Sequence, residues 1–385
     1  MPEDTMTPRE RWLAVLNRQS PDRVPTDYWA TAETTVRLIR YLGLSQKSEA
    51  ELLNDFGRSN ADDPVIALPP TDVRRLAFEA LQELHVDFVL RVGPRYAGPS
   101  LEAQTDPFGC RYQDVDYGAG VYAECIYHPL AQYQSVQEIE NSYTWPDADW
   151  WDYSHLPQQV KGMDAFPIQG GGSEPFLTYK SLRGQEQAFM DLVLNPEIVH
   201  YCLDKLFDLA YANTRRIYAQ IPGQVTLSYV AEDMGGQDDL MISPAQIREF
   251  LIPRMKRMID LAHEAGVFVF HHNDGACRRI IPDMVAAGID VLNPIQWRSK
   301  GMEREALKRD FGDRLVFHGA VDNQYTLPFG SVEEVHGEVL DNLRILGAGG
   351  GYILAPCHNL QSITPPANIV AMYQTCYEHG WTSNR

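Results

Sequence analysis

The segment VFVFHHNDG, residues 267–275, joins an apolar run directly to two histidines, a carboxylate and a glycine. A short apolar run that ends at a glycine turn is typical of a buried strand in a parallel sheet. Because side chains alternate along a strand, we expect Phe270, His272 and Asp274 on one side and His271 on the other. The spacing therefore predicts that His272 and Asp274 can bind one metal ion together. A hydrogen-bonded histidine pair in a polar loop is the alternative interpretation.

Outward from this segment, apolar runs of strand length alternate with helical patterns along the chain. The other predicted strands are residues 23–29, 86–92, 166–170, 225–231, 289–293, 315–318 and 351–355. Eight strands that alternate with helices predict an α/β protein, a (β/α)8 TIM barrel with residues 1–385 as one domain. An open doubly wound sheet is the alternative, although the glycine-rich fingerprint of that fold is missing after the first strand.

One region interrupts this regular alternation. Residues 93–165 are rich in glycine, proline, tyrosine and tryptophan. We interpret them as an inserted β-hairpin and ordered loop near the barrel mouth, where they could act as a lid over the site. The alternative is a structural insertion that only packs against the barrel.

Composition excludes several classes of partner. The chain has 33 basic and 52 acidic residues, a formal net charge of −19. This charge argues against binding to nucleic acid or to an anionic membrane surface. No apolar stretch reaches the ~20 residues of a membrane span, and the acidic N-terminus does not resemble a signal peptide. Six cysteines without CxxC spacing favour reduced thiols and a cytoplasmic location.

In a barrel, the carboxyl ends of the strands meet around one mouth, so polar residues at those ends are candidates for a shared site. The candidates for catalysis are Glu232, Asp233 and His318. The candidates for substrate binding are Gln169, Asn293, Gln296, Asp322 and His358. The candidates for metal binding are His272, Asp274 and Cys357.

A thiolate, an imidazole and a carboxylate suit Zn²⁺, and three protein ligands leave the open position that a catalytic site needs. Two of these candidates have plain structural alternatives. Cys357 could be a buried thiol that packs under His358. Asp322 could bind substrate or orient His318, and its structural alternative is a solvated loop carboxylate.

Several motifs carry a resemblance to a known family. They are MTPRER (6–11), PDRVP (21–25), IIPDMVAAGIDVLNPIQ (280–296), FHGAVDNQ (317–324) and GGGYILAPCHN (349–359). With these motifs the chain resembles the uroporphyrinogen decarboxylase-like superfamily, and its methyltransferase branch more than the decarboxylase itself. The resemblance implies a (β/α)8 barrel along essentially the whole chain. It is least secure over residues 93–165.

The resemblance also implies a metal site. In the corrinoid-linked and thiol methyltransferases of this superfamily, zinc is held by a His-x-Cys pair and a distant cysteine. Here His272-Asn273-Asp274 stands where His-x-Cys would be, and Cys357 matches the distant thiol. A carboxylate in place of a thiolate makes the metal harder and more Lewis acidic.

The resulting hypothesis is a metal-dependent methyltransferase. It would move a methyl group between a small O-, N- or S-methyl compound and a corrinoid protein or other acceptor. Glu232 or Asp233 would handle a proton or supply a fourth ligand. Any corrinoid would arrive on a separate partner protein, because no corrinoid-binding domain is visible, and a homodimer is a further expectation. The alternatives are a cofactor-free decarboxylase and a non-catalytic small-molecule-binding protein.

Overall fold

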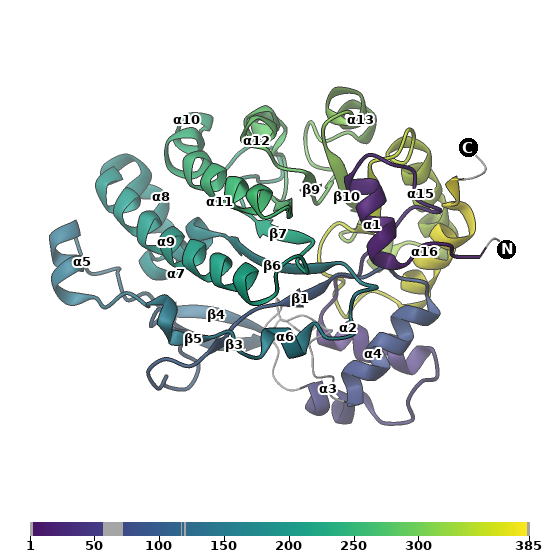
Figure 1. Cartoon of the computed structure of the whole chain (residues 1–385), viewed down its shortest axis with the longest axis horizontal. Coiled ribbons are helices and arrows are strands. Elements are labelled where there is room, and N and C mark those ends of the chain that lie inside the picture. Colours follow the sequence, from purple (N-terminus) through teal and green to yellow (C-terminus); the bar gives the residue numbers. More distant parts are fainter. Residues whose placement is uncertain (1–2, 57–71, 117, 119–120, 383–385) are drawn as a thin grey trace.

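The centre of the molecule is a curved parallel β-sheet with helices on its outer side (Figure 1). The computed structural model describes residues 3–56, 72–116, 118 and 121–382. Seven strands pair in the order β1-β6-β7-β8-β9-β10-β11. Their bounds are β1 (Leu90–Val92), β6 (Ile168–Ser173), β7 (Leu227–Val230), β8 (Phe268–His272), β9 (Val291–Asn293), β10 (Val316–Val321) and β11 (Tyr352–Pro356). The α/β class and the parallel sheet predicted from the sequence are confirmed.

Helices precede, connect and follow these strands. The principal helices are α1 (Pro8–Leu16), α2 (Ala32–Tyr41), α3 (Glu49–Phe56), α4 (Asp72–Glu83), α7 (Pro175–Arg183), α8 (Gln185–Leu194), α9 (Pro196–Gln220), α11 (Ile252–Glu264), α12 (Ile281–Ala287), α13 (Arg304–Phe311), α15 (Val332–Ile345) and α16 (Pro366–His379). Local sequence sets several starts: Thr7, Ser243 and Ser331 each form a capping box with the residue three positions on. Among the described helices, none has the length and apolar character needed to cross a membrane.

The prediction of a regular strand over residues 23–29 is wrong, because this segment forms only isolated bridges. Thr26 forms an isolated parallel bridge with Leu354 of β11. The Asp27 N–H donates to the Leu354 carbonyl at 2.9 Å, and the Leu354 N–H donates to the Pro25 carbonyl at 2.9 Å. The segment therefore lies beside β11, in the place where an eighth strand was expected.

Side chains explain why the opposite edge of this segment forms no regular ladder. The Thr26 N–H donates to Asp87 Oδ2 at 3.1 Å, and the Val89 N–H donates to Asp27 Oδ1 at 3.2 Å. Carboxylates thus take the role that backbone carbonyls have in a regular parallel pair. The segment is attached to the chain before β1 through these side chains.

Alternation along the strands separates two apolar cores. An inner cluster contains residues of α1, of the segment after it and of the five strands β7 to β11: Trp12, Val15, Leu16, Trp29, Leu227, Phe270, Val291, Val316 and Ile353. The neighbouring strand residues Leu90, Ile168, Val269, Leu292 and Phe317 belong to a larger outer cluster under the helices. On each strand, the residue two positions after an inner-cluster residue faces the same side of the sheet. These residues therefore lie at the carboxyl ends of the strands and face the interior.

Residues 93–165 contain short elements outside the main sheet. These are β2 (Arg95–Tyr96), β3 (Arg111–Asp116), β4 (Val121–Tyr127), α5 (Val136–Ser142), β5 (Trp151–Asp152) and α6 (Leu156–Gln159). β3 and β4 form an antiparallel pair, and β2 and β5 form another. Residues 117, 119 and 120 of this region lie outside the described residues. Whether the region acts as a lid remains a prediction.

A buried ion network ties the N-terminal segment to the chain before β1. Asp87, which is 1% exposed, accepts hydrogen bonds from the guanidinium groups of Arg11 and Arg23. Arg11 also donates to Asp22 at 2.6 and 2.9 Å, and the N–H groups of residues 5 and 6 donate to the same carboxylate at 2.8 and 2.9 Å. The network therefore joins α1, the segment after it and the region before β1.

This network predicts a pH dependence of stability. Burial raises the pKa of Asp22, but the bonds from Arg11 and the backbone N–H groups outweigh it and lower the pKa to about 2. A depressed native pKa stabilises the fold above the unfolded value of about 3.9, and this contribution is lost as pH falls towards 2. We expect Asp22→Asn to be less stable than the parent by about 1 kcal/mol at pH 7, since solvent reaches part of the network. Urea unfolding at pH 7 and at pH 3 to 2 measures the difference, which should shrink as the pH falls. A constant difference would contradict it.

Candidate functional site

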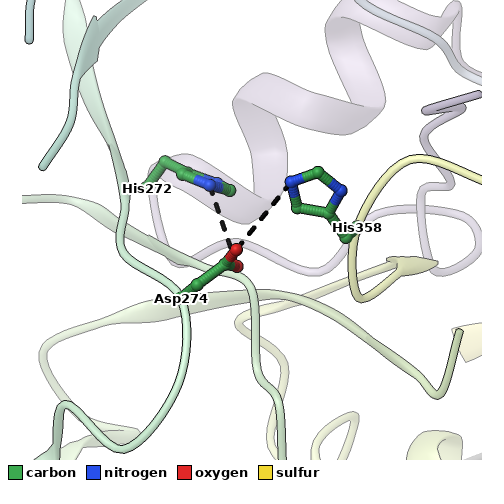
Figure 2. A group of neighbouring side chains, drawn as sticks. All are labelled: His272, Asp274 and His358. Carbon is green, nitrogen blue, oxygen red and sulfur yellow. Dashed lines mark ion pairs between the residues drawn. The ribbon is translucent and has the colours of Figure 1, made fainter. Parts of the chain in front are cut away.

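Three potential metal ligands meet where β8 and β11 end. Nε2 of His272 lies 3.8 Å from Oδ1 of Asp274, and Nε2 of His358 lies 3.8 Å from Oδ2 of the same carboxylate. One ligand atom from each of the three residues falls within 4.8 Å of the other two. Figure 2 shows the two imidazoles approaching Asp274 from different sides. The predicted pairing of His272 with Asp274 is thus present as a close contact.

Backbone packing holds the loop that carries Asp274. Gly275 has φ +75°, and a Cβ atom there would lie 2.3 Å from the carbonyl oxygen of Gly236. A Cβ on Gly235 would likewise lie 2.3 Å from the carbonyl oxygen of Asp274. The Ala276 N–H donates to the Gly236 carbonyl at 2.7 Å. Glycine is required at both positions because the two loops touch through their backbones.

A buried hydrogen-bond chain orients His272. Its Nδ1–H donates to Oδ1 of Asn293 at 2.6 Å, Nδ2 of Asn293 donates to Nδ1 of His318 at 2.7 Å, and Nε2–H of His318 donates to Oδ2 of Asp27 at 3.1 Å. The assignment of donors starts at Asp27, because a carboxylate can only accept. The Asn293 amide presents its NH₂ group to Nδ1 of His318, which accepts, and its oxygen to His272. The chain leaves the lone pair of His272 on Nε2, the atom that faces Asp274.

Asp27 is itself held by several donors. Its Oδ2 accepts from the indole Nε1–H of Trp29 at 2.8 Å, and its Oδ1 accepts from the backbone N–H of Tyr28 at 2.9 Å and of Val89 at 3.2 Å. These donors replace water around a carboxylate that is 2% exposed. A fixed acceptor at this end fixes the direction of the whole chain to His272.

Aromatic rings enclose the imidazole of His272. The rings of Trp29 and Tyr229 are nearly parallel to it, with centroids at 5.8 and 5.9 Å and interplanar angles of 19° and 29°. Phe270, one layer deeper, stacks against Trp29 at 5.9 Å. Together these rings limit the access of water to His272 from the interior of the sheet. The imidazole can therefore be approached from the side where the strands end.

Two acidic side chains face Nε2 of His272. Oδ1 of Asp233 lies 3.8 Å from it, the same separation as Oδ1 of Asp274. Both of these oxygens are buried and have no hydrogen-bond donor among the described residues. A buried carboxylate oxygen without a donor is unfavourable unless a cation neutralises it. This pair of orphaned acceptors is therefore a feature that a metal ion would satisfy.

Glu232, a predicted catalytic residue, occupies a different environment from Asp233. It is 1% exposed, and its Oε1 accepts from the N–H of Phe176 at the start of α7 at 2.9 Å. Burial, together with the nearby charge of Glu174, raises the pKa of Glu232 well above its usual value. Burial thus favours the protonated form of Glu232, whereas Asp233 faces the metal-ligand cluster.

The structure does not bring the Cys357 thiol into the cluster. Sγ of Cys357 donates to the carbonyl of Ile295 at 3.3 Å, and burial raises the pKa of the thiol well above 9. The neighbouring residue His358, predicted to bind substrate, supplies the third ligand atom instead. His272, Asp274 and His358 thus form the group of potential ligand atoms that lie together, while metal binding by His272, Asp274 and Cys357 stays a prediction.

Asp322 and Gln296 position loops. The carboxylate of Asp322 pairs with Nε of Arg298 at 2.8 Å and accepts from the N–H groups of Tyr325 and Thr326 at 3.0 Å. Asp322 is only 4% exposed, so it is not the solvated loop carboxylate of the alternative interpretation, and its printed partners do not include His318. Gln296 Oε1 accepts from the N–H of Gly275 at 2.7 Å, which steadies the loop beside Asp274.

A small, open pocket includes Cys357, the residue before His358, in its lining. It is lined by Gln296, Trp297, Arg298, Ser299, Asp322, Asn323, Gln324 and Cys357. The predicted residues Gln296, Asp322 and Cys357 thus share this cavity, while His272 and Asp274 are absent from its lining.

His271 faces away from the cluster, as strand alternation predicts. Its Nδ1–H donates to the carbonyl of Val230 at 2.6 Å, and burial lowers its pKa to about 4, so the ring is neutral at physiological pH. Sequence reasoning missed three contributors on the inner side, Asp27, Trp29 and Tyr229. Trp29 ends the predicted strand 23–29, and Asp27 and Tyr229 lie two residues before the ends of the predicted strands 23–29 and 225–231, so alternation could have placed all three on the inner side.

Comparison with known proteins defines the family. A family model described as uroporphyrinogen decarboxylase (URO-D) matches residues 156–379, more than half of the chain. A uroporphyrinogen decarboxylase of Pseudoalteromonas translucida is 26% identical over 221 residues, 55% of each chain. One from Thermus thermophilus is 30% identical over 138 residues, 34% of this chain and 36% of its own. The match thus spans about half the length of the first of these relatives and less of the second.

A solved structure supports the fold over a longer range. The methyltransferase from Methanosarcina mazei superposes with a TM-score of 0.65, covering 97% of this chain and 99% of its own, at 19% sequence identity. The superposition establishes a shared fold, and the low sequence identity leaves the reaction open. Together with the family match, it confirms the resemblance carried by the sequence motifs. The chain belongs to the uroporphyrinogen decarboxylase (URO-D) family.

Proposed function

We propose that this chain is a metal-dependent methyltransferase in which His272, Asp274 and His358 hold one divalent metal ion. The observation that carries the proposal is that one ligand atom from each of the three residues lies within 4.8 Å of the other two. It is supported by Oδ1 of Asp274, which is buried and has no hydrogen-bond donor among the described residues. In the same proposal, segment 23–30 closes a (β/α)8 barrel, and residues 1–385 form a single domain.

The distances fit a metal site. Two atoms that each lie about 2.1 Å from one ion are at most about 4.2 Å apart. Both histidine-to-Asp274 separations, at 3.8 Å, are below this limit. Two imidazoles and one carboxylate form a ligand set used by catalytic zinc, and they leave a position open for substrate. The same set suits other first-row divalent ions, so zinc is the first metal to test.

The residues around the ligands support methyl transfer. A bound divalent ion would act as a Lewis acid on the heteroatom of the methyl donor. Asn293 keeps the lone pair of His272 on Nε2, and Trp29 and Tyr229 restrict water. When the methyl–heteroatom bond breaks and the methyl group passes to the acceptor, the demethylated heteroatom gains a proton. That proton would come from solvent, and Oδ1 of Asp233, 3.8 Å from Nε2 of His272, would accept it and pass it to the heteroatom.

The acceptor in this proposal is a corrinoid on a separate protein. The experiment incubates the purified chain with zinc, a methoxy or methylamine donor and a corrinoid protein, and follows methylation of the corrinoid by its absorption spectrum. We expect about one zinc per chain and methyl transfer that a chelator abolishes. Release of carbon dioxide from a porphyrinogen by the metal-free chain would instead establish the decarboxylase activity named in the curated relatives. Absence of bound zinc with reduced thiols would reject the metal site.

A further inference from the structure

Two polar side chains that the proposed methyl transfer does not use lie side by side at the inner strand ends. Arg91 of β1 is in register with Gln169 of β6. Val89, two residues before Arg91, packs against the inner cluster, and Gln169 is also in register with Leu227, a member of that cluster. Leu90 belongs to the outer core. Because side chains alternate along strands, Arg91 and Gln169 both face the interior.

Neither side chain has a polar partner in the part of the chain that the structure describes. The guanidinium of Arg91 makes no hydrogen bond or ion pair there. It lies over the ring of Trp29, with its Cζ atom 4.4 Å from the ring centroid. Gln169 is only 9% exposed, yet its amide also has no hydrogen-bond partner among these residues. Neither side chain contributes to the fully enclosed polar atoms that lack a partner, so the amide and the guanidinium are accessible and can hydrogen-bond to a ligand.

The indole of Trp29 connects this pair to the metal-ligand cluster. It contacts Arg91, and its centroid lies 5.8 Å from that of the His272 imidazole at an interplanar angle of 19°. A planar molecule that lies along the indole would therefore have one end near Arg91 and Gln169 and the other near His272.

The donors define the chemistry of the ligand. A guanidinium presents two parallel N–H donors that match a carboxylate, and the Gln169 amide can donate a third hydrogen bond. The pair carries a single positive charge, while Asp233 and Asp274 lie near His272. A monoanion therefore fits better than a dianion such as a phosphate. We propose that Arg91 and Gln169 bind the carboxylate of a small, planar substrate; only the identification of its other end as a methyl donor rests on the proposed function.

The test uses the metal-free protein in the presence of a chelator. Isothermal titration compares 4-methoxybenzoate with its neutral analogue 4-methoxybenzamide. Hydrogen bonds to a charged group contribute about 1.5–3 kcal/mol, so we expect the parent to bind the acid at least about tenfold more tightly than the amide. Arg91→Gln should bring the two affinities within about twofold, and Gln169→Leu should reduce the preference about threefold or more. Arg95→Gln, which removes an equal charge from an exposed site four residues away, should keep the parent's preference.

Circular dichroism establishes that each variant is folded, and Arg91→Lys, which retains the charge without the planar fork, should keep part of the preference. Equal binding of acid and amide by the parent, or an undiminished preference in Arg91→Gln, would overturn the assignment. The two proposals fail separately. A carboxylate preference without any methyl transfer leaves this binding site standing and removes the proposed function, whereas methyl transfer without the preference does the reverse.

Discussion

His358→Ala should lower the affinity for zinc by more than about 100-fold, whereas Cys357→Ser should leave it within a few fold of the parent. Loss of a residue that only supports a ligand costs about 10- to 100-fold, and loss of a ligand costs more. Nε2 of His358 lies 3.8 Å from Oδ2 of Asp274, while the Cys357 thiol donates to the carbonyl of Ile295. Competition with a chromophoric chelator measures the affinities, and mass spectrometry measures the metal content of each purified variant.

A second matched pair of neighbours tests the other side of the site. His272→Ala should also lose most of the metal, and His271→Ala should keep it, because Nδ1 of His271 is bonded to the Val230 carbonyl on the opposite side of β8. All four variants should remain folded, since a large sheet protein does not depend on one ion as a small zinc domain does. Loss of metal from Cys357→Ser together with full metal in His358→Ala would restore the ligand set expected from the sequence.

The neighbouring residues His271 and His272, and Cys357 and His358, show where strand periodicity can predict the direction of a side chain and where it cannot. Within β8 the alternation is regular, so the sequence correctly predicted that His272 faces inward and His271 outward. Cys357 and His358 come just after β11 (Tyr352–Pro356), where the strand has ended. Alternation no longer applies there, so it could not decide which of these two side chains meets Asp274.

Polar contacts between residues far apart in the sequence could not be predicted for a different reason. Asp27 and His318 are 291 residues apart and meet through one hydrogen bond, which no local pattern encodes. The same holds for the segment over residues 23–29. Its apolar alternation correctly indicated an extended segment at the sheet, but its pairing depends on Asp87, a carboxylate 61 residues from Thr26. Periodicity therefore predicted the faces of the strands, and the polar partners needed the three-dimensional structure.

Asp87→Ala should reduce the free energy of unfolding by about 3–5 kcal/mol, the range observed when one partner of a buried ion pair is removed. Asp87 is 1% exposed and accepts from Arg11 and Arg23, which are 1% and 2% exposed. Its removal leaves two buried guanidinium groups short of an acceptor, and the backbone N–H of Thr26 loses its acceptor as well. The variant therefore weakens the attachment of the segment beside β11 as well as the ion network.

Urea unfolding followed by circular dichroism gives the comparison. Asp87→Asn keeps an oxygen acceptor for Thr26 but not the charge, so its free energy of unfolding should lie between those of Asp87→Ala and the parent. This variant replaces Asp87→Ala in the comparison if the alanine variant does not fold. The control is Glu49→Ala, since Glu49 pairs with Arg40 at 3.2 Å with both side chains more than 40% exposed. Such exposed pairs contribute about 0–1 kcal/mol, so this variant should match the parent. An Asp87→Ala protein within about 1 kcal/mol of the parent would mean that Asp4 and Asp22 alone satisfy both arginines.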